Sequence, residues 1–236
     1  MGKYLLISLL IGLLILVHEF GHLLAARLAG ISVERFSVGL GPRLWGYRRG
    51  GTEYCLSLIP FGGYVLLRAT EPEDLFRIPV HKRVGFLLGG PVANFLAAIP
   101  CLALVNALTQ GAGLKAILIQ PWLQAGHLCA QILAVFASVD PQQLSGLVGM
   151  VAQGGSQWSA SGVQLLLFAA VLSVNLGIFN LFPLPILDGG QVLLSLAEYL
   201  TPRVQKIRLP LAAAGWLLII VMLVYTTILD ISRLLA

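Results

Sequence analysis

Long apolar runs separated by shorter polar stretches dominate the hydropathy pattern of the chain. Four of these runs contain about 20 residues or more, the length that an α-helix needs to cross the hydrocarbon core of a bilayer. The predicted spans are approximately Tyr4–Ala29, Val84–Leu108, Val163–Phe182 and Leu209–Leu229. The pattern therefore predicts a mainly α, polytopic membrane protein with about four transmembrane helices in a single domain, residues 1–236.

The loop between the first two spans has a different periodicity. Residues 34–68 contain short segments in which polar and apolar residues alternate, divided by the turn sequence Arg49-Gly50-Gly51. We expect a β-hairpin here, followed beyond Pro60 and Gly62-Gly63 by a further strand, Tyr64–Leu67. The apolar positions predict a small sheet lying against the membrane interface, and the alternative is a basic surface loop.

The segment between the second and third spans, about residues 111–162, carries few charges. Its apolar part, Leu114–Ser138, is interrupted by Pro121 and by polar side chains. We therefore expect an interfacial helix or a pair of helices rather than a fifth span, and the pattern leaves open whether this part enters the membrane. A small polar linker, Gly154–Gly162, follows.

Composition agrees with a lipid environment. Charged residues make up 11% of the chain, whereas a soluble domain typically carries about 25%. The net charge is +5, but the basic residues lie between apolar runs, so we expect membrane lipid and not nucleic acid as a partner. The three cysteines include no CxxC pair, which predicts neither a disulfide framework nor a thiolate zinc site.

Basic residues also orient the predicted helices. Eight Lys and Arg residues lie between spans one and two, three between spans three and four, and one between spans two and three. Because positive loops face the cytoplasm, we expect the first and third loops on the cytoplasmic side and both termini on the other side. A cleaved signal peptide, Lys3 with Tyr4–Val17, is the alternative for the N-terminus, but the apolar pattern continues to Ala29.

One motif inside the first span carries chemistry. His18-Glu19-Phe20-Gly21-His22 is an HExxH sequence, and residues four apart lie on one face of a helix. His18 and His22 can therefore direct imidazole nitrogens at one zinc ion, with Glu19 placed to accept a proton from a metal-bound water. Ionisable groups inside a membrane are costly and are functional candidates by default. The alternative is a hydrogen-bonded cluster within a helix bundle.

A zinc site with two histidines needs a third protein ligand and one open position. His81 lies in the basic loop and His127 in the extracytoplasmic segment, whereas Asp188 follows the third span within NLFPLPILDGG. A rise of 1.5 Å per residue places His18 toward the cytoplasmic end of span one, where span three also ends. We expect His18, His22 and Asp188 to hold one Zn²⁺, although another divalent metal suits these ligands. A helix N-cap is the alternative role of Asp188.

The two motifs together resemble the site-2 protease family of membrane-embedded zinc metalloproteases, peptidase family M50. Further similarity lies in the segments Gly39–Pro42 and Ile59–Val65, which resemble the family's cytoplasmic β-loop, in Gly90–Asn94, which resembles its GPxxN motif, and in Ser145–Met150. The order of motifs is most similar to the bacterial branch that cleaves anti-sigma factors. That branch carries PDZ domains between spans two and three, and the segment here is too short for one.

The resemblance implies a zinc-dependent endopeptidase of the bacterial cytoplasmic membrane, with its active site toward the cytoplasm. It would hydrolyse peptide bonds in or near the transmembrane segments of other membrane proteins, for example anti-sigma factors or signal-peptide remnants. Glu19 would be the catalytic base that activates water and then protonates the leaving amine. His18, His22 and Asp188 would be the metal ligands.

Candidate substrate contacts come from the loop and from two amides. The resemblance suggests that an unwound substrate adds to the β-loop as a strand, with Gly62, Gly63 and Tyr64 as candidates for the edge. A plain turn is the equal alternative. Asn94 and Asn180 can orient substrate or stabilise an oxyanion, or can bond to a neighbouring helix. Asn180 is favoured for the substrate role because it is close to the Asp-Gly-Gly sequence.

Two other functions compete with proteolysis: transport of metal ions across the membrane, and a catalytically inactive scaffold of the same fold. Transporters typically have inverted repeats with paired broken helices, whereas this sequence shows one broken segment and no repeat. The intact Glu19 argues against the scaffold.

Overall fold

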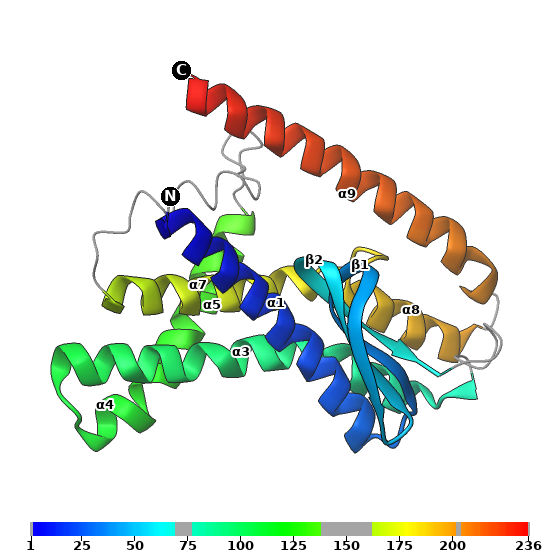
Figure 1. The fold of residues 1–236 in the computed structure, drawn as a ribbon, viewed down its shortest axis with the longest axis horizontal. Coiled ribbons are helices and arrows are strands. Elements are labelled where there is room, and N and C mark those ends of the chain that lie inside the picture. The colour runs from blue at the N-terminus through cyan, green and yellow to red at the C-terminus, as the bar shows by residue number, and fades with distance from the viewer. Residues whose placement is uncertain (1, 69–76, 138–161, 202–203, 236) are drawn as a thin grey trace. The chain divides into compact units, whose positions relative to one another are not determined.

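The computed structural model describes residues 2–68, 77–137, 162–201 and 204–235. The elements follow in the order α1 (Gly2–Leu28), β1 (Val33–Arg49), β2 (Thr52–Leu67), α3 (Val80–Gln110), α4 (Leu114–Leu118), α5 (Gln120–Ala137), α7 (Gly162–Asn180), α8 (Asp188–Leu200) and α9 (Val204–Leu235) (Figure 1). The prediction of a mainly α chain with a small sheet in its first loop is confirmed.

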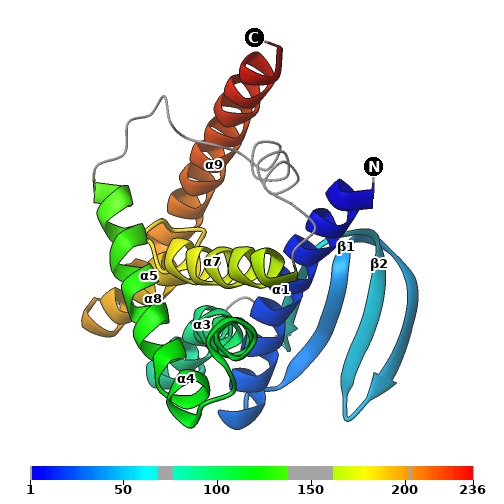
Figure 2. The ribbon, with the colours of Figure 1, turned by 90° about the vertical axis from the view of Figure 1, so that its left-hand side faces the viewer.

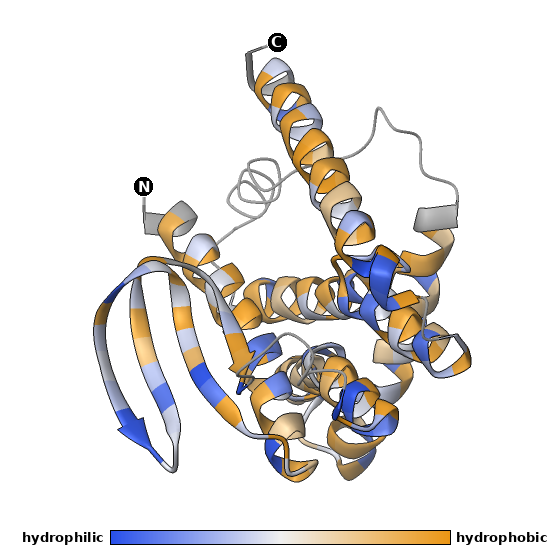
Figure 3. Ribbon diagram, turned by 90° about the vertical axis from the view of Figure 1, so that its right-hand side faces the viewer, coloured by the Kyte–Doolittle hydropathy of each residue, from blue (hydrophilic) through white to orange (hydrophobic). Residues whose placement is uncertain are grey.

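Four helices are long and apolar enough to cross a membrane. They are Leu5–Leu28 in α1, Val80–Gln110, Gly162–Asn180, and Val204–Ser232 in α9. Each coincides with a predicted span, with ends shifted by a few residues. The largest difference is at α9, which begins at Val204, so that Lys206 and Arg208 lie inside the helix and not in the loop before it. Apolar residues continue along almost all of this helix, and hydrophilic ones gather at its start (Figure 3).

The third span ends where the sequence changes character. α7 stops at Asn180, and the prolines Pro183 and Pro185 follow, each lacking the N–H that would continue a helix. A short turn then leads to α8, which starts at Asp188. Two glycines let this turn fold tightly on α8, because a Cβ on Gly189 would lie 2.0 Å from the carbonyl oxygen of Leu181.

The helix pair predicted between spans two and three is present as α4 and α5, and neither is among the four membrane-spanning candidates. A partly buried amide pair ties α5 to α3. The carboxamide nitrogen of Asn106 donates to Gln124 Oε1 at 3.0 Å, and Gln124 Nε2 donates back to Asn106 Oδ1 at 3.1 Å. The segment Ser145–Met150 and the predicted linker Gly154–Gly162 lie outside the described residues, except for Gly162, which begins α7.

The chain divides into two compact units. The first contains residues up to 11, 95–178 and 209 onward, and its core includes the small buried residues Ala98, Ala169 and Ala170. Small side chains let helix backbones approach closely inside a membrane, where packing rather than the hydrophobic effect drives association. The second unit, residues 12–94 and 179–208, contains the sheet, α8 and every candidate active-site residue.

The sheet consists of β1 and β2, two long strands that pair antiparallel around the predicted glycine turn, with φ of 57° at Gly50 and 80° at Gly51. Both strands curve strongly (Figure 2). As a result, Phe36 of β1 lies opposite both Tyr54 and Val65 of β2. The further strand predicted at Tyr64–Leu67 is present as the end of β2, which continues into it through Gly62 at φ of 97°.

The sheet packs on the C-terminal half of α1. Leu23 and Ala26 of α1 are buried together with Ile31, Val33 and Phe36 from the start of the loop and β1. Val65 and Phe86 pack against the same cluster. In the register, the last part of β2, Gly63–Leu67, pairs only with Val33–Val38 among the described residues, so it forms an edge of the sheet.

Helices α1 and α3 cross at glycines. A Cβ on Gly21 would lie 2.3 Å from the carbonyl oxygen of Gly89, and a Cβ on Gly89 would lie 2.6 Å from both the Gly21 oxygen and the Ala25 Cβ. These separations are far below van der Waals contact. The crossing therefore has room for backbone but not for side chains.

Gly89→Ala should destabilise the protein, with Gly85→Ala as the matched control one turn earlier in α3. A methyl at position 85 meets nothing within 4 Å, and alanine favours helix by up to about 1 kcal/mol over glycine. At position 89 the overpacking should lower the free energy of unfolding by about 1–3 kcal/mol. Unfolding of both variants in mixed detergent micelles measures the difference. Equal stabilities would contradict the tight crossing.

Candidate metal centre

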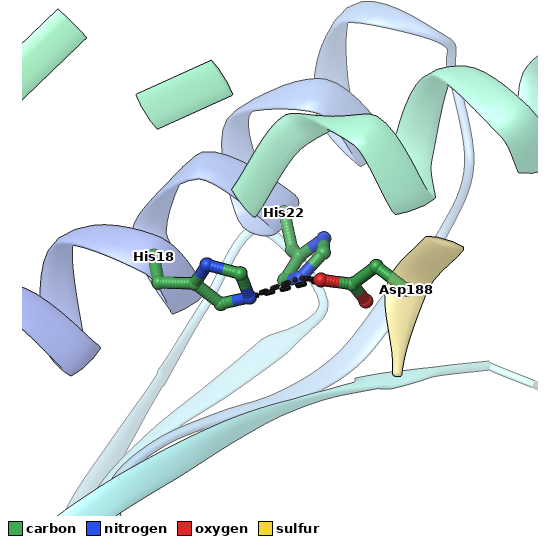
Figure 4. A group of neighbouring side chains, drawn as sticks. All are labelled: His18, His22 and Asp188. Carbon is green, nitrogen blue, oxygen red and sulfur yellow. Dashed lines mark hydrogen bonds and ion pairs between the residues drawn. The ribbon is translucent and has the colours of Figure 1, made fainter. Parts of the chain in front are cut away.

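Two imidazoles and one carboxylate converge in the second unit (Figure 4). His18 and His22 project from one face of α1, and Asp188 enters from the start of α8. The two Nε2 atoms are 3.1 Å apart, and Oδ2 of Asp188 lies 3.0 Å from that of His18 and 3.3 Å from that of His22. The structure therefore brings together all three residues that the sequence suggested as ligands, although their metal ligation stays a prediction.

The spacing of these atoms fits a zinc ion. A tetrahedral zinc with N and O ligands at about 2.0–2.1 Å has ligand atoms about 3.3 Å apart, close to the three observed separations. Three protein ligands also leave one tetrahedral position open. Both histidines are buried, with 7% of His18 and 6% of His22 exposed, so protein atoms cover most of the surface of both residues.

Groups of α3 contact the Nδ1 atoms of both histidines and so orient the imidazole rings. Nδ1 of His22 lies 2.8 Å from the carbonyl oxygen of Phe86. A carbonyl only accepts, so Nδ1 carries the proton and Nε2 presents its lone pair to the other ligands. The carboxamide of Asn94 lies 3.1 Å from Nδ1 of His18, and its oxygen end accepts the same kind of proton when the amide is turned.

Gly90 of α3 closes one side of the centre. A Cβ at this position would lie 2.5 Å from Nε2 of His22 and 2.6 Å from Nε2 of His18. An ion bound to both Nε2 atoms would lie at a similar short distance from each, so a Cβ at position 90 would overlap with it. The absence of a side chain at Gly90 therefore leaves open the space beside both Nε2 atoms.

Asp188 is held in its charged form. Burial by itself would raise the pKa of this carboxyl, but hydrogen bonding to His18 and His22 holds the pKa below its ordinary value. The loop behind it is compact, because a Cβ on Gly190 would lie 1.9 Å from the Leu184 carbonyl oxygen. An anionic oxygen is thus fixed beside the Nε2 atoms of both imidazoles.

A cavity of about 280 Å³ opens onto the three ligand atoms. Its lining also includes Glu19, Asn180, Tyr64 and Val65. Glu19 is partly buried and follows His18 directly in α1. The cavity therefore combines a metal-type ligand set with a further carboxyl group, an amide and part of the sheet edge.

The remaining sequence candidates lie in different positions. Gly63 is adjacent to Glu19, since a Cβ on Gly63 would lie 3.2 Å from Glu19 Cγ. Gly62 instead faces Leu40 and does not line the cavity, and Asn94 lies behind His18, which is the interhelical alternative for that residue. His81 and His127, the other histidines considered as ligands, are exposed.

Sequence reasoning missed four contributors: Phe86, Gly90, Val65 and Ile186, the last of which lines the cavity. Gly90 lies within the GPxxN-like segment, and the demand for a side-chain-free approach to HExxH could have identified it. Phe86 contributes a backbone oxygen, which no side-chain pattern reveals.

Comparison with known proteins identifies the family of the chain. The family model for peptidase family M50 matches residues 6–224. The chain belongs to peptidase family M50, the site-2 protease family. The M50 match contains the whole candidate centre.

Individual M50 relatives cover different shares of the chain. The chain is 40% identical over 113 residues to a Chlamydia pneumoniae protein named "Putative zinc metalloprotease", covering 41% of this chain and 18% of the relative. It is 46% identical over 105 residues to the protein named "Protease RseP" of Yersinia pestis, covering 40% of this chain and 23% of the relative. The chain thus spans less than a quarter of these two relatives.

A third relative is matched over most of its length. A Helicobacter pylori protein, also named "Putative zinc metalloprotease", is 26% identical over 302 residues, covering 78% of this chain and 86% of the relative. Because this alignment is longer than the chain of 236 residues, the Helicobacter protein contains residues that have no counterpart here.

Gly90→Ala should abolish metal binding while leaving the fold intact, because the added methyl group would occupy the space beside both Nε2 atoms. Metal content of the purified protein measures the effect, and Gly85→Ala serves as the control. Helical content measured by circular dichroism should be the same for both variants. A Gly90→Ala protein that retains a full equivalent of zinc would show that the ion does not lie between these nitrogens.

Proposed function

We propose that the chain is a zinc-dependent endopeptidase that cleaves membrane-protein substrates in or near their transmembrane segments. The observation that carries this proposal is the single cavity into which His18, His22, Asp188 and Glu19 all face. The helix bearing the HExxH sequence is also long and apolar enough to cross a membrane. Such a site would act on peptide bonds at membrane depth.

His18, His22 and Asp188 would hold one zinc ion. Bound zinc acts as a Lewis acid toward a carbonyl and lowers the pKa of water to about 7. Glu19 accepts the proton of the attacking water and delivers it to the amine nitrogen that leaves. Its position beside His18 in the helix and its place in the lining of the cavity suit this shuttle.

The amide of Asn180 is placed to assist the same reaction. It lines the cavity from the last residue of α7. A carboxamide N–H aimed at the developing oxyanion stabilises the charge that appears during attack. We assign Asn94 a positioning role instead, since its carboxamide contacts His18 and orients that imidazole ring.

Substrate would bind along the edge of the sheet. A helical substrate shields its own peptide bonds, so a segment must unwind before attack. The edge at Gly63–Leu67 is paired on one side only among the described residues, and Tyr64 and Val65 of this edge line the cavity. Strand addition there supplies main-chain hydrogen bonds without strict sequence demands. It would place the unwound backbone beside Glu19.

The orientation in the membrane follows from the basic loops. We place the sheet and the α8–α9 connection on the cytoplasmic side, both termini on the opposite side, and the cavity toward the cytoplasm. Anti-sigma factors and signal-peptide remnants are the substrate classes that this placement and the M50 family suggest. The segment between α3 and α7 is too short for a PDZ domain and a following helix, so selection by such a domain is not part of this proposal.

Glu19→Gln should abolish cleavage and keep the metal. The amide preserves size but cannot accept a proton, so turnover should fall by at least about 100-fold, the lower end of the usual contribution of general base catalysis. Zinc content and cleavage of a panel of single-span substrates in detergent measure the two effects.

Asp188→Ala is the contrasting variant, because it should lose zinc as well as activity. Cleavage that persists in Glu19→Gln would contradict the assignment of the base. Zinc-loaded protein that cleaves nothing but carries zinc into liposomes would favour transport. Neither activity in a zinc-loaded wild type would favour the scaffold.

Proline substitutions at Tyr64 and Val65 test the substrate edge. Neighbouring N–H groups of a strand point to opposite sides, so one of the two faces β1 and the other faces outward. One variant should lower thermal stability, and the other should lower cleavage at nearly unchanged stability. Melting temperature and cleavage rate of both variants separate the two cases. If neither reduces cleavage of folded protein, substrate does not pair with this edge.

A further inference from the structure

A polar cluster away from the three ligand atoms connects α8 to α3 and to the first turns of α9. Its members are Arg83 of α3, Gln191 and Glu198 of α8, and Arg208 of α9. All four lie in the same compact unit as the candidate centre. We call this cluster the α8 clamp.

One end of the clamp is a buried ion pair. Nη1 and Nη2 of Arg83 donate to the two carboxylate oxygens of Glu198 at 2.8 and 3.1 Å. Arg83 is 7% exposed and Glu198 8% exposed. Burial would raise the pKa of Glu198, but hydrogen bonds from Arg83 and Gln205 hold the pKa below its usual value. A two-point contact of this kind fixes orientation as well as distance, so it sets the position of α8 on α3.

The other end of the clamp lies next to the candidate ligand. Arg208 donates through Nε at 3.2 Å and Nη2 at 2.6 Å to Oε1 of Gln191. The amide nitrogen of Gln191 in turn donates to the carbonyl oxygen of Pro185. Asp188 lies three residues after Pro185 and three before Gln191. The chain of hydrogen bonds therefore holds the backbone on both sides of Asp188.

The three ligands differ in how firmly the local chain fixes them. His18 and His22 lie within the long helix α1, and their spacing follows from helix geometry. Asp188 is the first residue of its helix, and the backbone of its N-cap residue Leu187 is extended (φ −88°, ψ 160°) with no side-chain cap. Its distances of 3.0 and 3.3 Å to the imidazoles therefore depend on contacts made by the rest of α8.

We propose that the α8 clamp positions Asp188, and that Arg208 thereby sets the metal affinity of a site it does not touch. The proposal rests on the metal site proposed above. Positioning partners of metal ligands typically change affinity by about 10–100-fold when they are removed. α3 takes part twice, since it holds Glu198 through Arg83 and His22 through the Phe86 carbonyl. One helix thus aligns a carboxylate ligand with an imidazole ligand.

Cobalt(II) titration of the full chain in detergent tests the clamp without relying on proteolysis. Arg208→Met and Lys206→Met each remove one positive charge from the first turns of α9, and the side chain of Lys206 is exposed. Arg208→Met should weaken Co²⁺ binding by about 10-fold or more and should alter the visible absorption of the bound ion. Lys206→Met should match wild type in both. Gln191→Leu should behave like Arg208→Met, and Arg208→Lys should recover part of the affinity.

Melting of the metal-free proteins distinguishes positioning from a purely structural role. A structural role lowers the melting temperature but leaves the Co²⁺ affinity and spectrum of folded protein at wild-type values, and that result would overturn the proposal. If Arg208→Met does not fold, Gln191→Leu decides by the same two readouts. The metal site itself has a separate test, the Co²⁺ affinity of Asp188→Ala. An affinity equal to that of wild type would show that Asp188 is not a ligand. Lack of proteolysis by a metal-loaded wild type bears only on the proposed function.

Discussion

The contact between α1 and α3, made without side chains, is the constraint on which the candidate centre depends. Gly21 and Gly89 bring the two backbones to a separation that excludes even a methyl group. Only at that separation can the Phe86 carbonyl reach His22 and Gly90 leave space beside both Nε2 atoms. In a membrane, where apolar side chains gain little by leaving lipid, such close packing is also a main source of helix association. Gly21 and Gly89 therefore contribute both to the association of α1 with α3 and to the geometry of the candidate centre.

The remaining parts of the site are brought to this contact by different physical means. Helical spacing aligns the imidazoles, and a proline break followed by two glycines turns Asp188 back toward them. The sheet reaches the cavity because its apolar residues pack on the half of α1 that carries the HExxH sequence. Helical spacing, a proline break and the packing of a sheet on a helix are each common in proteins. Their convergence on one cavity of about 280 Å³ is what distinguishes a candidate M50 centre from a hydrogen-bonded cluster of intramembrane histidines.

Much of this arrangement could be predicted from sequence because the relevant signals are local. Apolar run length gives the four helices, the Gly50-Gly51 turn gives the hairpin, and spacing gives the pairing of His18 with His22. The sequence could not show that β2 continues through Gly62, since proline and glycine usually end a strand and only the register reveals a bend instead. It also could not assign Asn94, for which substrate binding and interhelical bonding look the same until its distance to His18 is known. The pairing of Arg83 with Glu198 joins residues 115 positions apart, and no local pattern encodes it.

The hydrogen bond from His22 to the Phe86 carbonyl limits what side-chain substitutions can reveal about the site. Every amino acid supplies the same carbonyl, so a substitution at position 86 changes the ring that packs on His22 but cannot delete the acceptor that sets its tautomer. A mutational scan of side chains would register both histidines and the aspartate, whereas at position 86 it would report only on the packing of the ring and not on the carbonyl. The group that decides which nitrogen faces the centre is thus shielded from point mutation, and its importance is visible only through changes, such as those at Gly89, that move the backbone of α3.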